Sequence, residues 1–215
     1  MPGMSRKPRR GATGVQIGEA QARGMILQGG VMVFAEKGSR AASVEDILAA
    51  GRVSRRTFYR LFDGKDAVMM ALYTMGTDRL YDECKRATDQ EPDPIRHVER
   101  FVDAHVGNAR MFGRLIFVLG GEAARQESPL HTKRMEVHGQ LVELLVQRHP
   151  DADPMLMRGV LLALEGVVRL MLEECDHGRK VTPEAMARVR KVMVRIATAT
   201  MAGEGPGVAP IPTRT

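Results

Sequence analysis

Four proline residues, each directly preceded by Asp, Ser or Thr, constrain the fold of this 215-residue chain more than any other feature. The four pairs are Asp93-Pro94, Ser128-Pro129, Asp153-Pro154 and Thr182-Pro183. Asp, Ser and Thr side chains cap the first N–H groups of a helix, and Pro suits the first helical position because no N–H donor is needed there. We therefore expect helices that begin at these pairs and end at about Asn108, Arg148, Cys175 and Met201. A further helix is expected at about 110–124, and no stretch shows the alternation of period two that is typical of strands.

A second set of helix signals lies in the first part of the chain. The expected helices are about 18–37, 43–51, 54–61 and, from Lys65 onward, about 65–87. Ser43 followed by Asp46 forms a capping box, and Ser54 would cap the short third helix. Two short helices joined by a tight turn that contains glycine describe a helix-turn-helix. Gly29 and Gly30 would lie in mid-helix, each costing about 1 kcal/mol relative to Ala, and a close approach between helices would explain them.

The positive charge of the chain is concentrated at its N-terminal end. Residues 1–60 hold 11 Lys and Arg against 4 Asp and Glu, a net charge of +7, whereas residues 61–215 hold 21 against 22, a net charge of −1. This asymmetry favours an N-terminal segment that binds a polyanion. We expect a disordered basic arm at 1–15, a helix-turn-helix domain at 16–64, a helical body at 65–202 and a disordered Pro/Gly-rich tail at 203–215.

Several other function classes lack their usual motifs. Cys84 and Cys175 are far apart and form no C-x-x-C motif, which favours a reducing cytoplasm. No run approaches the roughly 18 apolar residues that suggest a membrane span. The Cys and His spacings fit no metal site, and there is no Gly-rich phosphate loop and no nucleophile elbow. We therefore expect a cytoplasmic protein that is not an enzyme and has no cofactor or metal.

The segment VSRRTFYRLFDGKD, residues 53–66, has apolar residues for one face of a helix and cations and hydroxyl groups for the other, as a recognition helix does. Phe58, Leu61 and Phe62 are expected to pack against the preceding helices, which leaves the cations and hydroxyl groups facing outward. In the major groove an Arg can bind guanine O6 and N7, a Thr can contact a thymine methyl group, and a Tyr hydroxyl can reach a phosphate. Lys65 lies at a helix N-terminus, where the helix dipole disfavours a cation, and an approaching anion would explain its presence.

Residues of about 22–68 closely resemble the DNA-binding domain of the TetR family of bacterial regulators. The matching positions are Ile26-Leu27, Phe34, Gly38, Ser43-Val44, Ile47, Ala49-Ala50-Gly51, Val53-Ser54, Thr57-Phe58-Tyr59, Phe62 and Lys65-Asp66. Two positions depart from the family pattern: Gly29-Gly30 replaces the usual Ala pair, and Arg60 stands where many members have His. The resemblance implies an all-α homodimer, with an N-terminal three-helix DNA-binding domain and a C-terminal helical bundle that binds a ligand and dimerises.

The resemblance and the chemistry of the third helix together give the expected DNA contacts. The expected DNA-binding residues are Ser43, Ser54, Arg55, Arg56, Thr57, Tyr59, Arg60 and Lys65. In relatives of this type the last two helices form a four-helix interface across the dimer axis. A two-fold dimer would place two recognition helices on a palindromic operator in double-stranded DNA.

The candidate ligand residues lie on helices that surround a cavity in the family. They are Met75, Arg79, Phe101, His105, Phe112, Leu115, Phe117, Leu119, His138, Met171 and Cys175. Phe and Met favour an apolar ligand, and Arg79, His105 or His138 would hold a polar end. A plain core or surface role is the alternative for each residue.

These features predict a ligand-responsive transcriptional repressor that a small apolar effector releases from its operator. Activation stays open, because the sign of regulation depends on operator position. A rival from another class is a helical dimer that does not bind DNA and acts as a small-molecule carrier or interaction scaffold. Its basic segment would then bind acidic proteins or anionic lipid, and it would prefer no DNA sequence. The sequence identifies neither the effector nor the operator.

Overall fold

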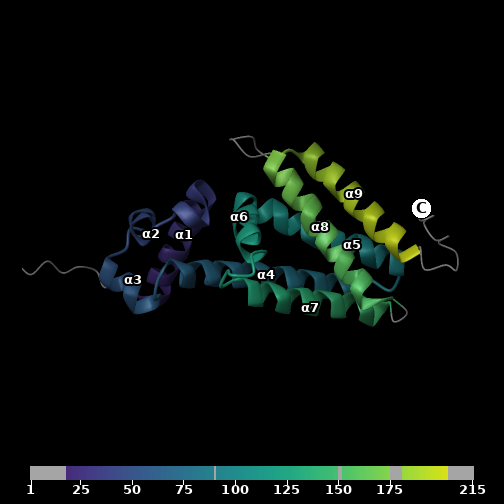
Figure 1. Cartoon of the computed structure of the whole chain (residues 1–215), viewed down its shortest axis with the longest axis horizontal. Helices are drawn as coiled ribbons and strands as arrows, with labels where there is room; N and C mark the ends of the chain where they lie inside the picture. The colour runs from purple at the N-terminus through teal and green to yellow at the C-terminus, as the bar shows by residue number, and fades with distance from the viewer. Residues whose placement is uncertain (1–17, 90, 150–151, 175–180, 203–215) are drawn as a thin grey trace, which may run out of the picture.

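The computed structural model describes residues 18–89, 91–149, 152–174 and 181–202, and within them the chain forms nine helices and no strand (Figure 1). The helices are α1 (Glu19–Ala41), α2 (Val44–Gly51), α3 (Arg55–Leu61), α4 (Lys65–Asp89), α5 (Pro94–Phe112), α6 (Arg114–Ala123), α7 (His131–Arg148), α8 (Pro154–Glu174) and α9 (Pro183–Ala202). The expected all-α class is confirmed. The expected arm and tail and Cys175 lie outside the described residues. None of the described helices combines the length and hydrophobicity that a membrane span requires.

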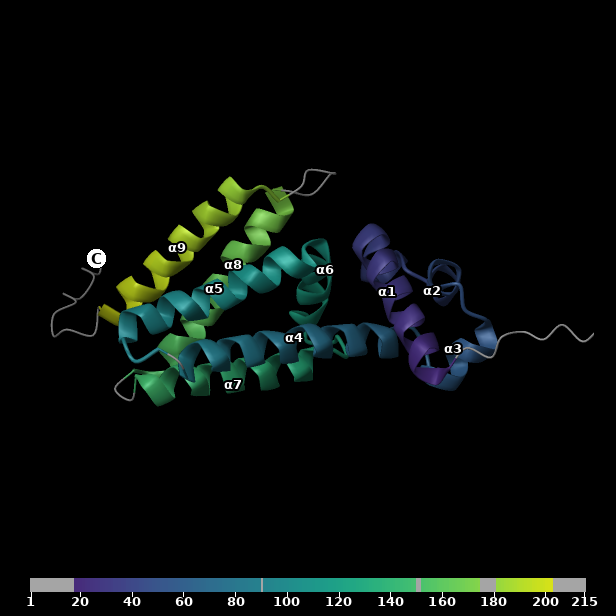
Figure 2. The same cartoon turned by 180° about the vertical axis from the view of Figure 1, so that it is seen from behind.

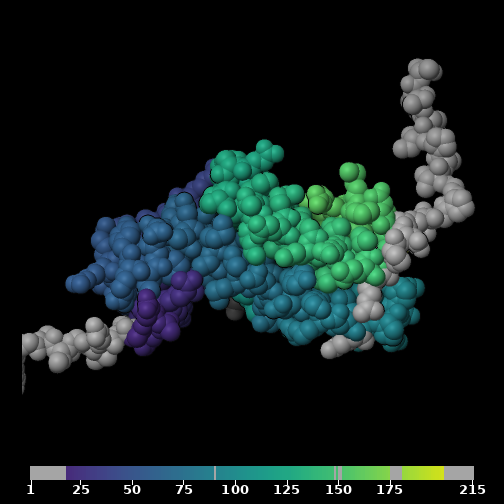
Figure 3. All heavy atoms as spheres, turned by 90° about the horizontal axis from the view of Figure 1, so that it is seen from below, coloured from purple at the N-terminus to yellow at the C-terminus, as the bar shows by residue number. Residues whose placement is uncertain are grey.

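The molecule is elongated, with α1, α2 and α3 at one end and the remaining helices at the other (Figures 1 and 2). The long helix α4 runs from the three-helix unit into the body, where α7 lies alongside it and α9 lies alongside α8. In the space-filling view of Figure 3 the two parts meet without a break. The helix α6 lies between α1 and the body and contacts α1, α7 and α8.

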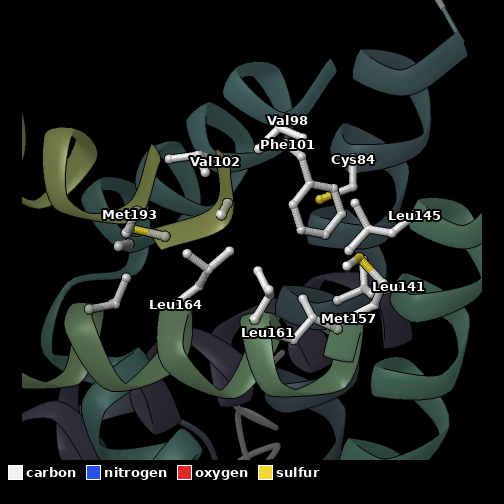
Figure 4. Packing of buried hydrophobic residues seen from close by; sticks show 14 of the residues in the cluster. Cys84, Val98, Phe101, Val102, Leu141, Leu145, Met157, Leu161, Leu164 and Met193 are labelled. Atoms are coloured by element: carbon white, nitrogen blue, oxygen red, sulfur yellow. The ribbon is translucent and has the colours of Figure 1, made fainter. Parts of the chain in front are cut away.

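Two hydrophobic cores correspond to these two parts. The first core lies among α1–α3 and continues past residue 64, because it includes Val68 and Leu72 of α4 and Leu119 of α6. The second core lies between α5, α7, α8 and α9. Figure 4 shows side chains such as Phe101 of α5 and Leu161 of α8 converging there. The start of α4 is therefore shared between the two parts.

Three of the four expected proline starts are confirmed by their capping bonds. Asp93 Oδ1 accepts the N–H groups of Ile95 and Arg96 at 2.9 and 3.0 Å. Asp153 Oδ1 accepts the N–H of Met155 at 2.7 Å, and Thr182 Oγ1 accepts that of Ala185 at 3.2 Å. These short-range side-chain bonds are the reason that the sequence located these three helices well.

The expected start at Ser128-Pro129 is wrong. The helix α7 begins at His131, and the Ser128 hydroxyl accepts the N–H of Leu130 at 3.2 Å in a turn that precedes the helix. Leu130 is completely buried in the first core. The free energy gained by burying the Leu130 side chain is larger than the local preference of Ser128-Pro129 for starting a helix. The expected boundary between the helices at 94–108 and 110–124 also moves, to Gly113, where φ is 49°.

The glycines of α1 mark close helix crossings, as expected. A Cβ atom at Gly29 would lie 2.7 Å from the backbone nitrogen of Gly51, and one at Gly51 would lie 2.7 Å from the carbonyl oxygen of Met25. These contacts join the backbones of α1 and α2 directly. A Cβ atom at Gly30 would instead lie 2.8 Å from Cγ1 of Val68 on α4. Glycine therefore sets the distance at which α2 packs on α1.

Candidate nucleic-acid interface and interior pockets

Two aromatic side chains hold α3 in the first core: Phe58 within the helix and Phe62 at its C-terminal end. Phe58 is fully buried and Phe62 is 5% exposed, with their ring centroids 6.1 Å apart. Arg23 of α1 covers the other side of Phe62, with its guanidinium carbon 4.6 Å from the ring centroid. Because these contacts fix one face of α3, its opposite face points to solvent.

The exposed face of α3 carries the predicted DNA-binding side chains. Ser54, Arg55, Arg56, Tyr59 and Arg60 are exposed, whereas Thr57 is partly buried. Arg55 forms an ion pair with Glu45 of α2, and its guanidinium carbon lies 6.0 Å from the Tyr59 ring centroid. Arg56 and Arg60 have no carboxylate partner in the described part of the chain, so both guanidinium groups are available to an anion.

Ser54 and Thr57 are joined to each other at the N-terminus of α3. The Ser54 hydroxyl accepts the N–H of Thr57 at 3.1 Å, and the two hydroxyl oxygens are 2.8 Å apart. The expected cap on the third helix is therefore confirmed. The cap fixes the end of α3 that a recognition helix places against base edges.

Ser43 caps α2 through a complete capping box. Its N–H and its hydroxyl donate to Asp46 Oδ2 at 3.0 and 2.7 Å, and its hydroxyl accepts the N–H of Asp46 at 3.2 Å. Hydrogen bonds from Lys37 and Ser43 lower the pKa of the Asp46 carboxyl to about 2. Because the donors of Ser43 are engaged in the cap, a phosphate at this helix end would meet the N–H groups of the first helical turn, at Val44 and Glu45.

The ammonium group of Lys65 is hydrogen-bonded to backbone carbonyl oxygens of the same chain. Its ammonium group donates to the carbonyl oxygens of Ser39, Arg40 and Ala42 at 3.0, 3.4 and 2.9 Å. These carbonyls lie at the junction of α1 and α2, next to Gly38, whose φ of 78° ends the regular part of α1. A cation at the start of α4 is thus explained by helix-end carbonyls, and the external anion that its position suggested is not required.

Two adjacent chambers, each partly open to solvent, lie between the helices of the body, with volumes of about 240 and 110 Å³. The larger, outer chamber is lined by Tyr73, Ile116, Phe117, Gly120, Gly121, Ala124, Arg134, Leu162, Glu165, Gly166 and Arg169. The smaller, inner chamber is lined by Leu72, Tyr73, Gly76, Thr77, Asn108, Phe112, Leu115, Ile116, Leu119, Gly120 and Glu165. The two share Tyr73, Ile116, Gly120 and Glu165, so they form one site divided by these side chains. Helices α4, α5, α6, α7 and α8 all contribute to its walls.

The structure brings four of the predicted ligand residues together at this site. Phe117 lines the outer chamber, and Phe112, Leu115 and Leu119 line the inner one. His138 lies immediately behind, because its Nε2 atom is 2.6 Å from Oε1 of Glu165.

The other predicted ligand residues lie elsewhere. Met75 and Arg79 line an open groove of about 860 Å³ between α1, α4 and the junction of α5 and α6, which shares Leu72, Phe112 and Leu115 with the smaller chamber. Phe101 and Met171 are buried in the second core, 1% and 4% exposed, and the ring of Phe101 packs there among other apolar side chains (Figure 4). Their assignment to a pocket is therefore corrected: apolar residues at helical spacing fill a core as readily as they line a cavity.

His105 is a core residue as well. Its Nδ1 atom is 3.0 Å from the carbonyl oxygen of Phe101 and 3.8 Å from the sulfur of Cys84. Burial lowers the pKa of His105, which keeps the ring neutral at neutral pH. His105 therefore satisfies its ring nitrogen within the chain and does not line either chamber.

Glu165 is the central charged group of the site, although sequence reasoning missed it. Burial alone would raise the pKa of Glu165, but hydrogen bonds and charge from His138 and Arg134 lower it below its ordinary value. The Arg134 guanidinium donates to Glu165 Oε2 at 2.7 Å. The carboxylate is therefore ionised and already has two basic partners.

Arg169, Asn108 and Tyr73 were also missed. The Arg169 guanidinium carbon lies 5.1 Å from the Phe117 ring centroid. Asn108 Oδ1 is buried and has no hydrogen-bond partner within the described residues. Burial raises the pKa of Tyr73. The spacing of Glu165 and Arg169, four residues apart on one helix, is the only signal in the sequence that could have linked two of these groups. No group of three or more potential metal ligands occurs among the described residues.

Comparison with known proteins agrees with the geometry of the N-terminal unit. The model of the "Bacterial regulatory proteins, tetR family" matches residues 26–72, whereas a comparison with curated proteins gives no match. Among solved structures, the fatty acid degradation regulator FadR from Bacillus halodurans has a TM-score of 0.69 at 22% identity, over 85% of this chain and 96% of that one. A TetR-like regulator from Rhodococcus sp. RHA1 has a TM-score of 0.68 at 17% identity, over 88% and 100%. The TetR-family regulator PfmR from Thermus thermophilus has a TM-score of 0.63 at 22% identity, over 80% and 96%.

These likenesses show a shared fold along most of the chain, and the family model covers the capped α2 and α3 together with the glycine contacts that hold them on α1. The N-terminal unit therefore matches the tetR family of bacterial regulatory proteins in sequence, and the chain as a whole shares the fold of solved TetR-family regulators.

Proposed function

We propose that the protein is a ligand-responsive transcriptional repressor that binds a palindromic operator as a homodimer. The observation that carries the proposal is the exposed face of α3, where Arg56, Tyr59 and Arg60 project from a helix whose opposite face is fixed by Phe58 and Phe62. An α-helix with its side chains is about 10–12 Å in diameter, which fits a major groove about 12 Å wide.

The proposed DNA contacts follow from the exposure and pairing of each side chain. Arg56 and Arg60 are the candidates for guanine or phosphate, and Tyr59 is the candidate for phosphate. Arg55 would exchange Glu45 for DNA, and Ser54 and Thr57 would approach the bases at the capped end of α3. Ser43 would act through the N-terminus of α2. We place Lys65 as a residue that positions the junction of α1 and α2.

Effector control is supported by the position of α6. This helix lines both chambers with one side, and its Glu122 side chain accepts a hydrogen bond from the Ser39 hydroxyl of α1 at 2.9 Å. A molecule bound in the chambers would therefore contact α6 and could displace it, and α6 in turn contacts the DNA-binding unit. Release of DNA follows if the effector binds better to a body conformation in which the two recognition helices are wrongly spaced.

Selection of bound sequences from random duplex DNA tests this function. The proposal predicts an enriched sequence with two symmetric half-sites, and an affinity that falls as salt increases because phosphate contacts release counterions. A salt titration on the enriched duplex and on random duplex then measures the preference. Equal affinity for both duplexes at every salt concentration would support the carrier or scaffold alternative instead.

A homodimer through the last two helices is supported by apolar side chains left exposed there. Leu162 and Leu170 of α8 are 46% and 62% exposed, Met155 of the same helix is 80% exposed, and Val192 of α9 is 40% exposed. The three α8 positions share one side of the helix. A second copy of the chain would cover these side chains.

Replacement of Leu170 by Asp should convert the dimer to a monomer, because two copies of a charge would be buried in the interface. The control is Met135→Asp, which places the same charge on the exposed surface of α7, where Met135 is 38% exposed. Sedimentation equilibrium measures the molecular mass of both variants. An L170D protein that remains a dimer, or an M135D protein that dissociates equally, would contradict the assignment of the interface.

A further inference from the structure

We propose that the effector is a small amphipathic anion, whose charged group binds Arg169 at the outer chamber and whose apolar part occupies the inner chamber. The inference rests on the proposed function, since it names the chemical class of the effector. It is carried by three features of the site: the balance of charge, the position of one guanidinium group and the apolar walls of the inner chamber.

The balance of charge leaves one cation without a partner. Glu165 is bound by Arg134 at 2.7 Å and by His138 at 2.6 Å, so its charge is already compensated. Arg169 lines the same chamber, but it forms no ion pair with any carboxylate in the parts of the chain that the structure describes. Arg169 would repel a cationic ligand, and the one carboxylate nearby, Glu165, is already paired. An anionic ligand would instead be attracted by the guanidinium group of Arg169.

The Arg169 side chain is exposed and lies against α6. Its guanidinium group lies over the Phe117 ring, at 5.1 Å, and close to the backbone of Gly121, four residues further along the helix. A Cβ atom at Gly121 would lie 3.0 Å from Nη1 of Arg169, so only glycine leaves the guanidinium group its full space. A guanidinium group over an aromatic ring can still donate two parallel hydrogen bonds, the geometry that carboxylates and phosphates accept.

The inner chamber suits an apolar group. Leu72, Phe112, Leu115 and Leu119 form much of its wall, together with the shared Ile116. Asn108, Thr77 and Glu165 give it a polar side. Both chambers together fall near the lower end of the range of about 300–1,000 Å³ for ligand pockets, so the ligand is small.

Gly120 gives access from one chamber to the other. It lines both chambers, and no atom lies within 4 Å of the position that its Cβ atom would occupy. A molecule that reaches from Arg169 into the inner chamber would lie against the wall to which this residue belongs. Replacement of Gly120 by Leu would fill the passage without forcing the helix apart, and Leu also favours helix more than Gly does.

Four probes with the same eight-carbon chain test the charge class: octanoate, octyl phosphate, 1-octanol and octylamine. Calorimetric titration of the full-length protein should show that at least one of the two anions binds about ten-fold or more tightly than both the alcohol and the amine. The difference between octanoate and octyl phosphate then tells a carboxylate effector from a phosphate one. Anions that bind no better than octanol and octylamine would overturn the proposal.

Two variants assign the binding to this site. Arg169→Gln should lower the affinity for the anion about ten-fold and leave octanol binding unchanged, whereas the control Arg158→Gln removes an exposed Arg from the same helix outside both chambers and should have no effect. Gly120→Leu should remove the binding of every probe while the thermal unfolding temperature is retained. Unchanged anion affinity in either R169Q or G120L would overturn the proposal.

The operator assay separates this inference from the proposed function. If octanol or octylamine releases the operator and the anions do not, the protein is ligand-responsive and the charge class is wrong. If the protein binds no preferred DNA sequence but the anions still bind through Arg169, the anion site stands and the proposed function fails. The predicted result is operator release by an anion in wild type and in R158Q, and retention of the operator in R169Q and G120L at the same concentration.

Discussion

Replacement of Gly51 by Ala is expected to destabilise the N-terminal three-helix unit by about 1–3 kcal/mol or more. The added Cβ atom would lie 2.7 Å from the carbonyl oxygen of Met25 and 3.3 Å from its carbonyl carbon. These are backbone atoms inside α1, which cannot rotate away as a side chain can. The helices α1 and α2 would have to separate, and the packing around Ile26 and Ile47 would be lost with them.

Four Gly→Ala variants test this explanation, because it predicts the order of their free energies of unfolding. Gly29→Ala should resemble Gly51→Ala, because its Cβ atom would also meet backbone atoms, at 2.7 and 2.8 Å. Gly30→Ala should cost less, because it meets the ends of the Val68 and Leu72 side chains, which can move. Gly24→Ala is the matched control on α1. No atom lies within 4 Å of its Cβ position, so this variant should gain about 0.5–1 kcal/mol.

Urea unfolding followed by circular dichroism measures the free energy of unfolding of each variant. The account predicts the stability order Gly24→Ala, wild type, Gly30→Ala and then the two backbone-contact variants. If Gly51→Ala and Gly29→Ala were as stable as wild type, the close approach of α1 and α2 would be wrong.

Replacement of Arg56 and Tyr59 by Ala is expected to abolish the operator shift in a gel while the dimer stays intact. A base or phosphate contact of this kind is worth about 1–3 kcal/mol, so each single variant should weaken binding by roughly five-fold to more than one-hundred-fold. Both side chains are exposed, and the Tyr59 ring contacts the edge of Phe58 and the guanidinium group of Arg55. Stability should therefore change little.

The two contacts should also differ in how they depend on sequence. If Arg56 binds a guanine, Arg56→Ala should relax specificity at one position of each half-site. Tyr59→Ala should weaken all sequences uniformly, as loss of a phosphate contact does. The control is Arg96→Ala, which removes an exposed positive charge from α5 in the body and should leave the shift unchanged. Normal operator binding by both Arg56→Ala and Tyr59→Ala would show that α3 is not the recognition helix.

The N-terminal unit could be predicted from sequence because short-range interactions define it. Ser43, Asp46 and Ser54 make their capping bonds within three residues, so local sequence contains the information. Phe58 within α3 and Phe62 directly after its end are both apolar aromatic residues, so their burial against the preceding helices was expected from the sequence. Lys65 shows the limit of this reasoning: its partners are carbonyl groups more than twenty residues earlier in the chain, at the end of α1.

The effector site could be predicted only in part, because five helices form it. Phe112 and Leu119 were found through the expected apolar lining, yet Phe101 and Met171 have the same apolar character and fill a core instead. In the sequence Arg169 is indistinguishable from a solvated surface cation. Only the crossing of α6 and α8 places its guanidinium group over Phe117 at the mouth of the outer chamber. Such long-range crossings are not encoded in helical periodicity.

Methylation interference on the selected operator tests the central claim most directly, since dimethyl sulfate modifies guanine N7 in the major groove, the atom that Arg56 or Arg60 would bind. We predict that methylation of a guanine in each of two symmetric half-sites blocks binding by the wild-type protein. Binding by a variant in which the responsible Arg is replaced by Ala should be insensitive to that methylation. Binding that tolerates methylation of every major-groove guanine, and that is blocked only by methylation at minor-groove adenine N3, would contradict the insertion of α3 into the major groove.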